Sequence, residues 1–65
     1  MSDRGTLQWA EDVLVEFRGL DIGRDLGGGN VQFRDLSNGQ FTFASDFWTY
    51  FRENYEELKA EGAFS

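Results

Sequence analysis

The stretch VQFRDLSNGQFTFA, residues 31–44, decides the fold, because it has the pattern of two apolar runs joined by a tight turn. Asn38-Gly39 near its middle is the strongest short-range signal of a β-hairpin. A two-residue turn on that pair would place Arg34 opposite Phe43, which mixes charged and apolar faces. A three-residue turn with Gly39 in the left-handed conformation places Phe33 opposite Phe43 instead, and we adopt this register.

The hairpin strands are expected over residues 30–36 and 40–44, with four apolar side chains on a common face: Val31, Phe33, Phe41 and Phe43. A two-stranded hairpin alone is marginal in water, so it must pack against helices or gain a further strand. The segment Leu-Asp-Ile at 20–22 can supply that third strand. Between it and the hairpin, three consecutive glycines at 27–29 predict a turn or a mobile loop.

Upstream of the hairpin, residues 6–18 carry apolar side chains at three- and four-residue steps, which is the helical period: Leu7, Ala10, Val13, Leu14 and Phe17. Thr6 has the side chain of an N-cap, and Gly19 can adopt the left-handed conformation that ends a helix. Val13, Val15 and Phe17 also alternate, so a strand is the competing interpretation. The longer helical stripe and its two end signals favour a helix.

Downstream of the hairpin, a second helix is expected, with its large apolar side chains on one stripe: Phe47, Trp48, Phe51, Tyr55 and Leu58. Ser45 is its expected N-cap, Asp46 lies in its first turn, and Gly62 is its expected C-cap. The fold class is therefore α+β, in which a helix, an antiparallel hairpin that a short third strand can extend, and a C-terminal helix pack together. The 65 residues make one small globular domain, 1–65.

The composition excludes several kinds of site. With no Cys and no His, the chain has neither disulfides nor zinc sites of the Cys/His kind. The glycine loop lacks the Gly-Lys-Ser/Thr ending of a phosphate-binding loop, and its oxygen ligands lack the EF-hand spacing of a calcium site. We therefore expect no cofactor and no metal. No stretch approaches the roughly 18 apolar residues of a membrane span, and no signal peptide is visible, so a cytoplasmic protein is expected.

The charge of the chain is one-sided. Twelve Asp and Glu against six Lys and Arg give a net charge of -6 at pH 7, which argues against direct binding to nucleic acid or anionic lipid. On the predicted C-terminal helix, Glu53, Glu57 and Glu61 form an i, i+4, i+8 row. Like charges at this spacing destabilise a helix by roughly 0.2–0.5 kcal/mol per pair. One interpretation of the row is a surface that binds a cationic partner. The other, which explains the row equally well, is a solvated surface that keeps the protein soluble.

The residues expected to bind a partner are this row, its neighbours on the same helix, and an acidic pair on the first helix: Asp46, Tyr50, Glu53, Glu56, Glu57, Glu61, Asp12 and Glu16. Tyr50 belongs to the set because it lies on the acidic side of its helix, and aromatics amid charge are frequent interface anchors. Trp9, at the margin of an apolar stripe, is interpreted as cover for the core. Without His or Cys, catalysis would depend on carboxylates or Lys59, so no enzyme is expected.

In its small size, its acidity and its lack of Cys and His, the chain resembles the inhibitors that phages carry against bacterial defence, the anti-CRISPR and anti-restriction proteins, several of which mimic DNA. The acidic residues just named carry the resemblance. It implies a non-enzymatic inhibitor, a monomer or weak dimer, that binds the Lys/Arg-rich nucleic-acid surface of a bacterial defence complex and blocks DNA access. Acidic DNA mimics are often more heavily charged, which favours local competition with DNA over mimicry of a whole duplex.

Two other functions compete with this one. A general interaction or assembly module would use an aromatic patch around Trp9, Tyr50 and Phe64, with the acidic residues serving solubility alone. A small hydrolase would need a pocket that holds two close carboxylates.

Overall fold

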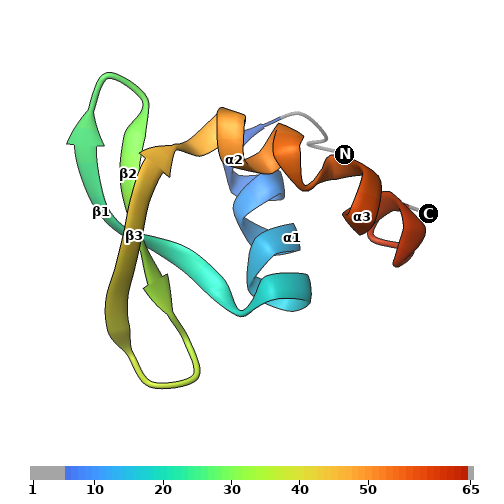
Figure 1. The fold of residues 1–65 in the computed structure, drawn as a ribbon, viewed down its shortest axis with the longest axis horizontal. Helices are drawn as coiled ribbons and strands as arrows, with labels where there is room; N and C mark the ends of the chain where they lie inside the picture. Colours follow the sequence, from blue (N-terminus) through green and yellow to red (C-terminus); the bar gives the residue numbers. More distant parts are fainter. Residues whose placement is uncertain (1–5, 65) are drawn as a thin grey trace.

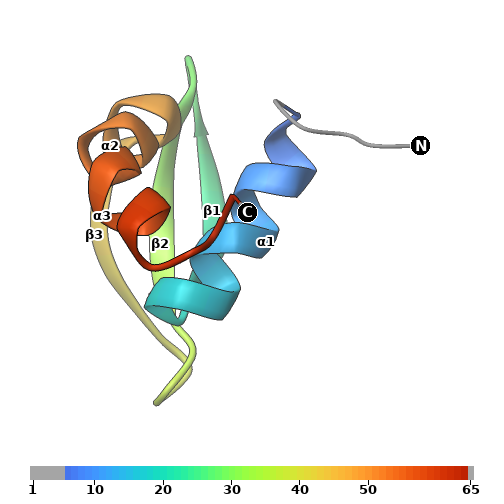
Figure 2. The same cartoon turned by 90° about the vertical axis from the view of Figure 1, so that its right-hand side faces the viewer.

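The computed structural model describes residues 6–64, which contain three helices and three strands in this order: α1 (Leu7–Arg18), β1 (Leu20–Gly27), β2 (Asn30–Asp35), β3 (Gln40–Asp46), α2 (Phe47–Glu53) and α3 (Tyr55–Ala60). The strands form one antiparallel sheet in the order β1-β2-β3. All three helices lie on one face of this sheet, with α1 beside the α2–α3 pair (Figures 1 and 2). The predicted α+β class is confirmed.

Helix α1 begins and ends at the residues that its caps predict. The Thr6 hydroxyl oxygen accepts a hydrogen bond from the backbone N–H of Trp9 at 3.2 Å. Gly19 adopts the left-handed conformation with φ 66°, and its N–H donates to the carbonyl of Val15 at 3.2 Å. Between these caps the segment is helical and buries Ala10, Val13 and Leu14 of its apolar stripe, so the alternative interpretation as a strand is wrong.

The third strand is longer than predicted. Strand β1 covers Leu20–Gly27 and takes in much of the segment expected to be a loop. The turn that the three glycines predict is present at residues 28–29, where Gly28 and Gly29 both have positive φ. Pairing with β2 therefore converts a glycine-rich connection into ordered sheet.

The β2–β3 hairpin contains a bulge that changes which way one phenylalanine faces. Its turn covers residues 36–39, one residue more than predicted, with Gly39 left-handed at φ 71°. Near the turn Arg34 pairs with Phe41, whereas farther along Gln32 pairs with Ala44, so β3 holds an extra residue between these pairs. Phe41 consequently shares a face with Arg34, not with Phe33. The predicted common face of Val31, Phe33, Phe41 and Phe43 is wrong for Phe41.

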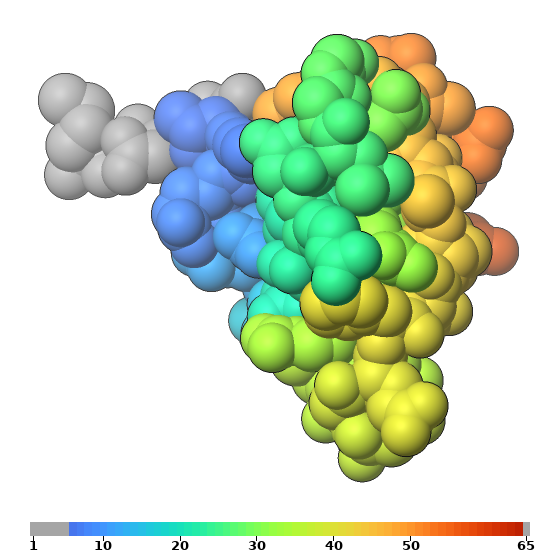
Figure 3. All heavy atoms as spheres, turned by 90° about the vertical axis from the view of Figure 1, so that its left-hand side faces the viewer, coloured from blue at the N-terminus to red at the C-terminus, as the bar shows by residue number. Residues whose placement is uncertain are grey.

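Phe41 lies on the outer face of the sheet, above a glycine of β1. A Cβ atom on Gly23 would approach Cε1 of the Phe41 ring to 2.8 Å, so only glycine leaves room for the ring. The Arg24 guanidinium carbon lies 4.7 Å from the ring centroid, and Arg34 beside it pairs with Asp21. Figure 3 shows this outer face, which no described helix covers.

The core lies between the inner face of the sheet and the helices. Its buried members come from four of the six elements, α1, β2, α2 and α3: Ala10, Val13, Leu14, Val31, Phe33, Phe47, Phe51 and Leu58. The Phe33 ring centroid lies 4.9–6.0 Å from those of Phe43, Phe47 and Tyr50. Aromatic side chains thus supply the buried area that a 65-residue chain needs.

The C-terminal helix begins one residue later than predicted. Ser45 pairs with Val31 in the sheet, so β3 runs on to Asp46 before the chain turns into α2. The Asp46 carboxylate then accepts the backbone N–H of Thr49 at 3.0 Å. The N-cap is therefore Asp46, and the assignment of Ser45 as N-cap is wrong.

The predicted single C-terminal helix is interrupted at Asn54. This residue has φ -99° and ψ 2°, and its side-chain amide donates to the carbonyl of Tyr50 at 2.9 Å. Asn side chains that bond to nearby backbone compete with continuous helix. At the far end the C-cap is Glu61, so the assignment of Gly62 as C-cap is wrong by one residue; Gly62 follows in the left-handed conformation with φ 91°.

Candidate functional site

The predicted acidic row and its acidic neighbours on the same helix are divided among three places in the structure. Asp46 lies at the start of α2, where its carboxylate caps the helix. Glu53 ends α2 and Glu56 lies in the first turn of α3, so the break at Asn54 separates them. Both glutamates are exposed, and neither forms an ion pair with any residue in the described range 6–64.

Glu57 and Glu61 both form ion pairs with Arg18, the last residue of α1. Arg18 Nη1 lies 2.9 Å from Glu61 Oε1, and its Nη2 lies 3.5 Å from Glu57 Oε1. The hydrogen bond to Glu61 raises the pKa of Arg18, and the charges of both glutamates add to this. Two carboxylates against one guanidinium leave this cluster negative, while the contact fastens α3 to the end of α1.

The acidic pair on α1 lies on the solvent side of that helix. Asp12 and Glu16 are exposed, and Asp12 accepts a hydrogen bond from the side-chain amide of Gln8 at 2.9 Å. A third acid, Glu11, accepts the backbone N–H of Ile22 at 3.0 Å and so holds α1 to β1. The sequence gives no sign of this contact, because its partners meet only after the chain turns back at Gly19.

Tyr50 is packed into the margin of the core. Its ring centroid lies 4.9 Å from that of Phe33 and 5.1 Å from that of Phe43. Burial raises the pKa of its hydroxyl, and the charge of Glu57 acts in the same direction. The structure therefore gives Tyr50 a packing role, and its expected role in partner binding stays a prediction.

Trp9 is half-buried against two rings of the C-terminal half. Its ring centroid lies 5.6 Å from that of Phe51 and 5.5 Å from that of Phe64. The interpretation of Trp9 as cover for the core is confirmed. Since Tyr50 packs on Phe33 and Phe43 instead, the three predicted members of an aromatic patch do not form one group of contacting rings.

The charge is divided unequally between the two layers of the fold. The helical segments, defined as the helices with the capping residues Asp46 and Glu61 (residues 7–18 and 46–61), contain eight Asp and Glu against three Lys and Arg, a net charge of -5. The sheet segment, residues 19–45, contains three Asp against two Arg, a net charge of -1. All the helices lie on one face of the sheet (Figure 2), so most of the negative charge belongs to segments on that side of the molecule.

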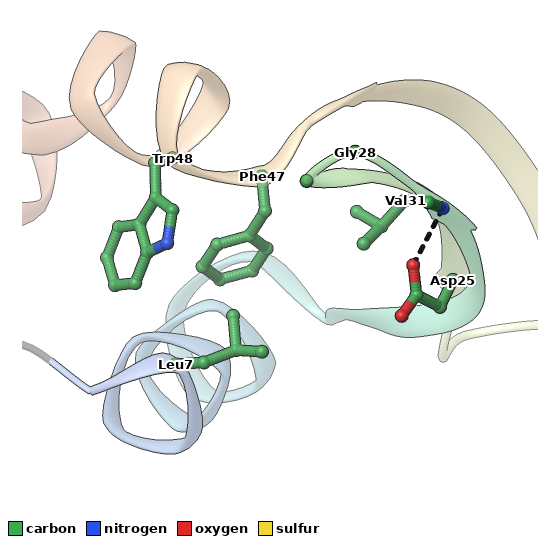
Figure 4. Close-up of a pocket in the computed structure, with 8 residues that line it drawn as sticks. Leu7, Asp25, Gly28, Val31, Phe47 and Trp48 are labelled. Atoms are coloured by element: carbon green, nitrogen blue, oxygen red, sulfur yellow. Dashed lines mark hydrogen bonds between the residues drawn. The ribbon is translucent and has the colours of Figure 1, made fainter.

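A pocket of about 200 Å³ lies between the start of α1, the glycine turn and the start of α2 (Figure 4). Apolar side chains from three elements line it, namely Leu7, Val31, Phe47 and Trp48. The one carboxylate in its lining is Asp25, whose Oδ1 accepts the backbone N–H of Gly27 at 2.9 Å. The pocket thus lacks the carboxylate pair that the hydrolase alternative requires.

Neither a group of metal-ligand residues nor a membrane-spanning helix is found among residues 6–64. Among residues 6–64, no three His, Cys, Asp or Glu side chains are grouped so as to hold a metal ion. In the same range, no helix has the length and apolar character needed to cross a membrane.

The capping role of Asp46 predicts a pH dependence of stability. The hydrogen bond from the Thr49 N–H lowers the pKa of Asp46 below its usual value. A carboxyl whose pKa is lowered by folding stabilises the protein above its unfolded pKa, and this contribution is lost as pH falls through the folded value. We expect the thermal midpoint to fall between about pH 5 and about pH 2, and to fall less in Asp46→Asn, which caps without titrating. Equal slopes in the two proteins would contradict this assignment.

No protein-family model matches the chain, and neither a curated protein nor a solved structure is similar enough to it to count as a match.

Proposed function

We propose that this protein is a non-enzymatic inhibitor that binds the Lys/Arg-rich nucleic-acid surface of a bacterial defence complex, such as a CRISPR surveillance complex, and competes locally with DNA. The observation that supports the proposal is the separation of charge between the two layers. Helical segments with a net charge of -5 present an acidic surface, while the sheet segment carries -1. A cationic channel would attract the helical side and orient the molecule as it approaches.

The junction of α2 and α3 is the part of this surface best suited to contact a partner. Glu53 and Glu56 are exposed there, and no Arg or Lys of the described chain lies within ion-pair distance of them. Their carboxylates are therefore available for charge-assisted hydrogen bonds with a partner's guanidinium or ammonium groups. A single exposed ion pair contributes only about 0–1 kcal/mol, so binding would require several such contacts at once.

The size of the protein supports local competition over imitation of a long duplex. Its described part measures 29 × 26 × 23 Å, which is less than one turn of B-DNA, about 34 Å. An inhibitor of this size would cover a small part of a DNA channel, such as an entry point where a few basic residues first contact the duplex.

The proposal is tested by displacement of a labelled DNA duplex from purified RNA-guided surveillance complexes. In the double variant Glu53→Gln, Glu56→Gln, we expect the half-inhibitory concentration to rise about tenfold, which corresponds to about 1.4 kcal/mol. Inhibition by the unaltered protein should weaken as NaCl rises from about 0.1 M to about 1 M, because the Debye length falls from about 10 Å to about 3 Å.

A matched control removes the same charge from the other layer. The double variant Asp25→Asn, Asp35→Asn loses two carboxylates of the sheet segment and keeps an oxygen acceptor at each position. We expect this variant to inhibit almost as well as the unaltered protein. Equal losses in the two double variants, or displacement that does not depend on salt, would contradict the proposed surface.

A further inference from the structure

The two edges of the sheet are protected to different degrees. The β1 edge carries three charged residues, Asp21, Arg24 and Asp25, and its pairing with β2 has two irregularities. Glu11 of α1 also occupies the backbone N–H of Ile22 on this strand. Charges, bulges and covering elements are the devices by which natural sheets prevent pairing with a further strand.

The β3 edge has little of this protection. Residues 36–45 form the longest uncharged run of the chain, and the strand residues 40–45 include neither a charge nor a proline. Phe43 packs on Tyr50 of α2, yet 43% of it stays exposed to water. A single bulge interrupts the pairing of β3 with β2, and within residues 6–64 no strand lies beyond β3 (Figure 1). This edge is therefore open to a further strand.

The hydrogen-bond pattern shows which backbone groups of β3 point toward the open edge. The last facing pair of the β2–β3 ladder is Asn30–Asp46. Just beyond it, the N–H of Phe47 donates to the carbonyl of Gly29 at 3.0 Å, so that last pair is of the kind that exchanges no hydrogen bonds. Pairs of this kind alternate along an antiparallel ladder, and Ala44, two residues back, belongs to the next one. The N–H and C=O of Ala44 therefore point away from β2.

The helices beside β3 are acidic. Helix α1 packs over β1, whereas α2 follows β3 directly and contacts it (Figure 2). Residues 46–61, which include α2 and α3, contain five Asp and Glu against two Lys and Arg, a net charge of -3. Tyr50 faces β3, since its ring centroid lies 5.1 Å from that of Phe43, and Glu53 lies one turn farther along the same side of α2. A strand added to β3 would run beside this acidic surface.

The charge of that surface decides which kind of strand can occupy the edge. A second copy of the chain, paired through β3, would bring its own acidic α2 and α3 to the same face of the joined sheet and would be repelled. A cationic segment is attracted instead, because its charges complement those of residues 46–61 and the strand itself adds no opposing charge over residues 40–45.

We propose that β3 pairs antiparallel with an extended segment of a partner protein that carries Lys or Arg at alternate positions, so that the partner adds a fourth strand to the sheet. Alternate side chains of a strand lie on the same face, so one set of cations lies on the helical side. Their methylene stems cover the exposed part of Phe43, and their charged ends reach the carboxylates of α2 and α3. Main-chain hydrogen bonds supply the affinity, and the alternate cations supply the specificity.

A synthetic peptide tests this mode of binding. The probe has about nine residues, blocked ends, and lysine alternating with threonine, and its binding is measured by titration calorimetry. We expect a dissociation constant of about 0.1 mM, and at least tenfold weaker binding when glutamate replaces each lysine. Amides of β3 should gain protection from hydrogen exchange when the lysine peptide is added, whereas amides of β1 should not.

Two methylated peptides of identical charge separate strand pairing from electrostatic attraction. Facing residues of an antiparallel ladder share a face, and Ala44 lies with its exposed side chain on the outer face. With the lysines on the helical side, the threonines therefore direct their N–H groups toward β3. Methylation of the threonine nitrogens should weaken binding at least tenfold, and methylation of the lysine nitrogens should change it less than about twofold.

A pair of protein variants locates the interface on β3. Ala44→Pro removes the outward N–H, and an edge strand tolerates proline where its N–H faces solvent. Ala44→Val is the matched control, because it keeps both the N–H and the charge. We expect at least tenfold weaker binding of the lysine peptide to Ala44→Pro and a change of less than about twofold for Ala44→Val. If Ala44→Pro does not fold, the methylated peptides keep the test decisive.

Three results would overturn the inference: no binding at about 1 mM lysine peptide, equal binding of the two methylated peptides, or new protection on β1 instead of β3. The inference rests on the proposed function for its cationic partner, but the peptide assay contains no defence complex. If the peptide does not bind while the protein still displaces DNA, the strand pairing alone is wrong. If the peptide binds and no DNA is displaced, the inhibitor function alone is wrong.

Discussion

Replacing Phe33 with alanine is expected to remove a large share of the free energy of unfolding of the protein. The Phe33 side chain is fully buried in the centre of the sheet, where its ring contacts those of Phe43, Phe47 and Tyr50. Truncation of a buried phenylalanine to alanine destabilises a protein by about 3–5 kcal/mol. A domain of this length has a total stability of only about 3–10 kcal/mol, so one such cavity removes a large share of it.

Urea unfolding followed by far-ultraviolet circular dichroism measures the effect of Phe33→Ala. Phe43→Ala is the matched control, because its ring contacts Phe33 at 5.0 Å while nearly half of its side chain is exposed to water. The same deletion there creates a smaller cavity, and we expect a clearly smaller loss of stability. A larger loss in Phe43→Ala than in Phe33→Ala would show that the core is centred elsewhere.

Replacing Phe51 with alanine is expected to release the C-terminal part of the chain as well as to lower global stability by about 3–5 kcal/mol. The buried ring of Phe51 is the centre of an aromatic cluster, with centroids 5.6–6.4 Å from those of five other rings: Trp9, Phe47, Trp48, Tyr55 and Phe64. Through these contacts it joins α2 to α1 and to the residues after α3. Helix α3 has only six residues, and a helix that short is not stable without tertiary contacts.

Amide exchange together with urea unfolding separates the two effects of Phe51→Ala. We expect the amides of α3 to lose protection under conditions in which the amides of β2 keep theirs. Tyr55→Ala serves as the control, because this exposed ring contacts the same cluster from its margin through Phe51 and Phe64. If α3 and β2 lose protection together, the C-terminal segment is not a separately released unit and this prediction is wrong.

Helix α1 could be predicted from the sequence because all of its signals are local. The helical spacing of its apolar residues, the hydroxyl of Thr6 and the left-handed conformation of Gly19 act within one or two turns of the chain. The hairpin could be located for the same reason, since Asn38-Gly39 specifies a turn through its own backbone preferences. These features need no information about what packs on them.

The details that were predicted wrongly depend on contacts between distant segments. Ser45 pairs with Val31 across the sheet and so leaves the cap to Asp46. The bulge in β3 turns Phe41 to the outer face, where the ring fits over Gly23 of another strand. Neither outcome has a signature within a few residues along the chain, because each is selected by the strand opposite.

In the candidate site, too, some features follow from composition and others depend on contacts between distant segments. Composition alone fixes the net charge of -6 and the lack of Cys and His. The expected row of Glu53, Glu57 and Glu61 required one unbroken helix. In the structure the break at Asn54 separates Glu53 from the other two, and Glu57 and Glu61 are paired with Arg18. The association of Arg18 with α3 joins residues about forty positions apart, which no helical pattern encodes.

The sequence by itself determined the first helix, the position of the hairpin and the acidity of the protein, because helical period, caps, turn residues and charge are properties of short segments or of composition. Only the tertiary structure decided that the helices lie together on one face of the sheet, that most of the negative charge belongs to segments on that side, and that strand β3 forms an open edge. The physical reason is that segments far apart in the chain come together only when the sheet and the helices bury their apolar faces against each other.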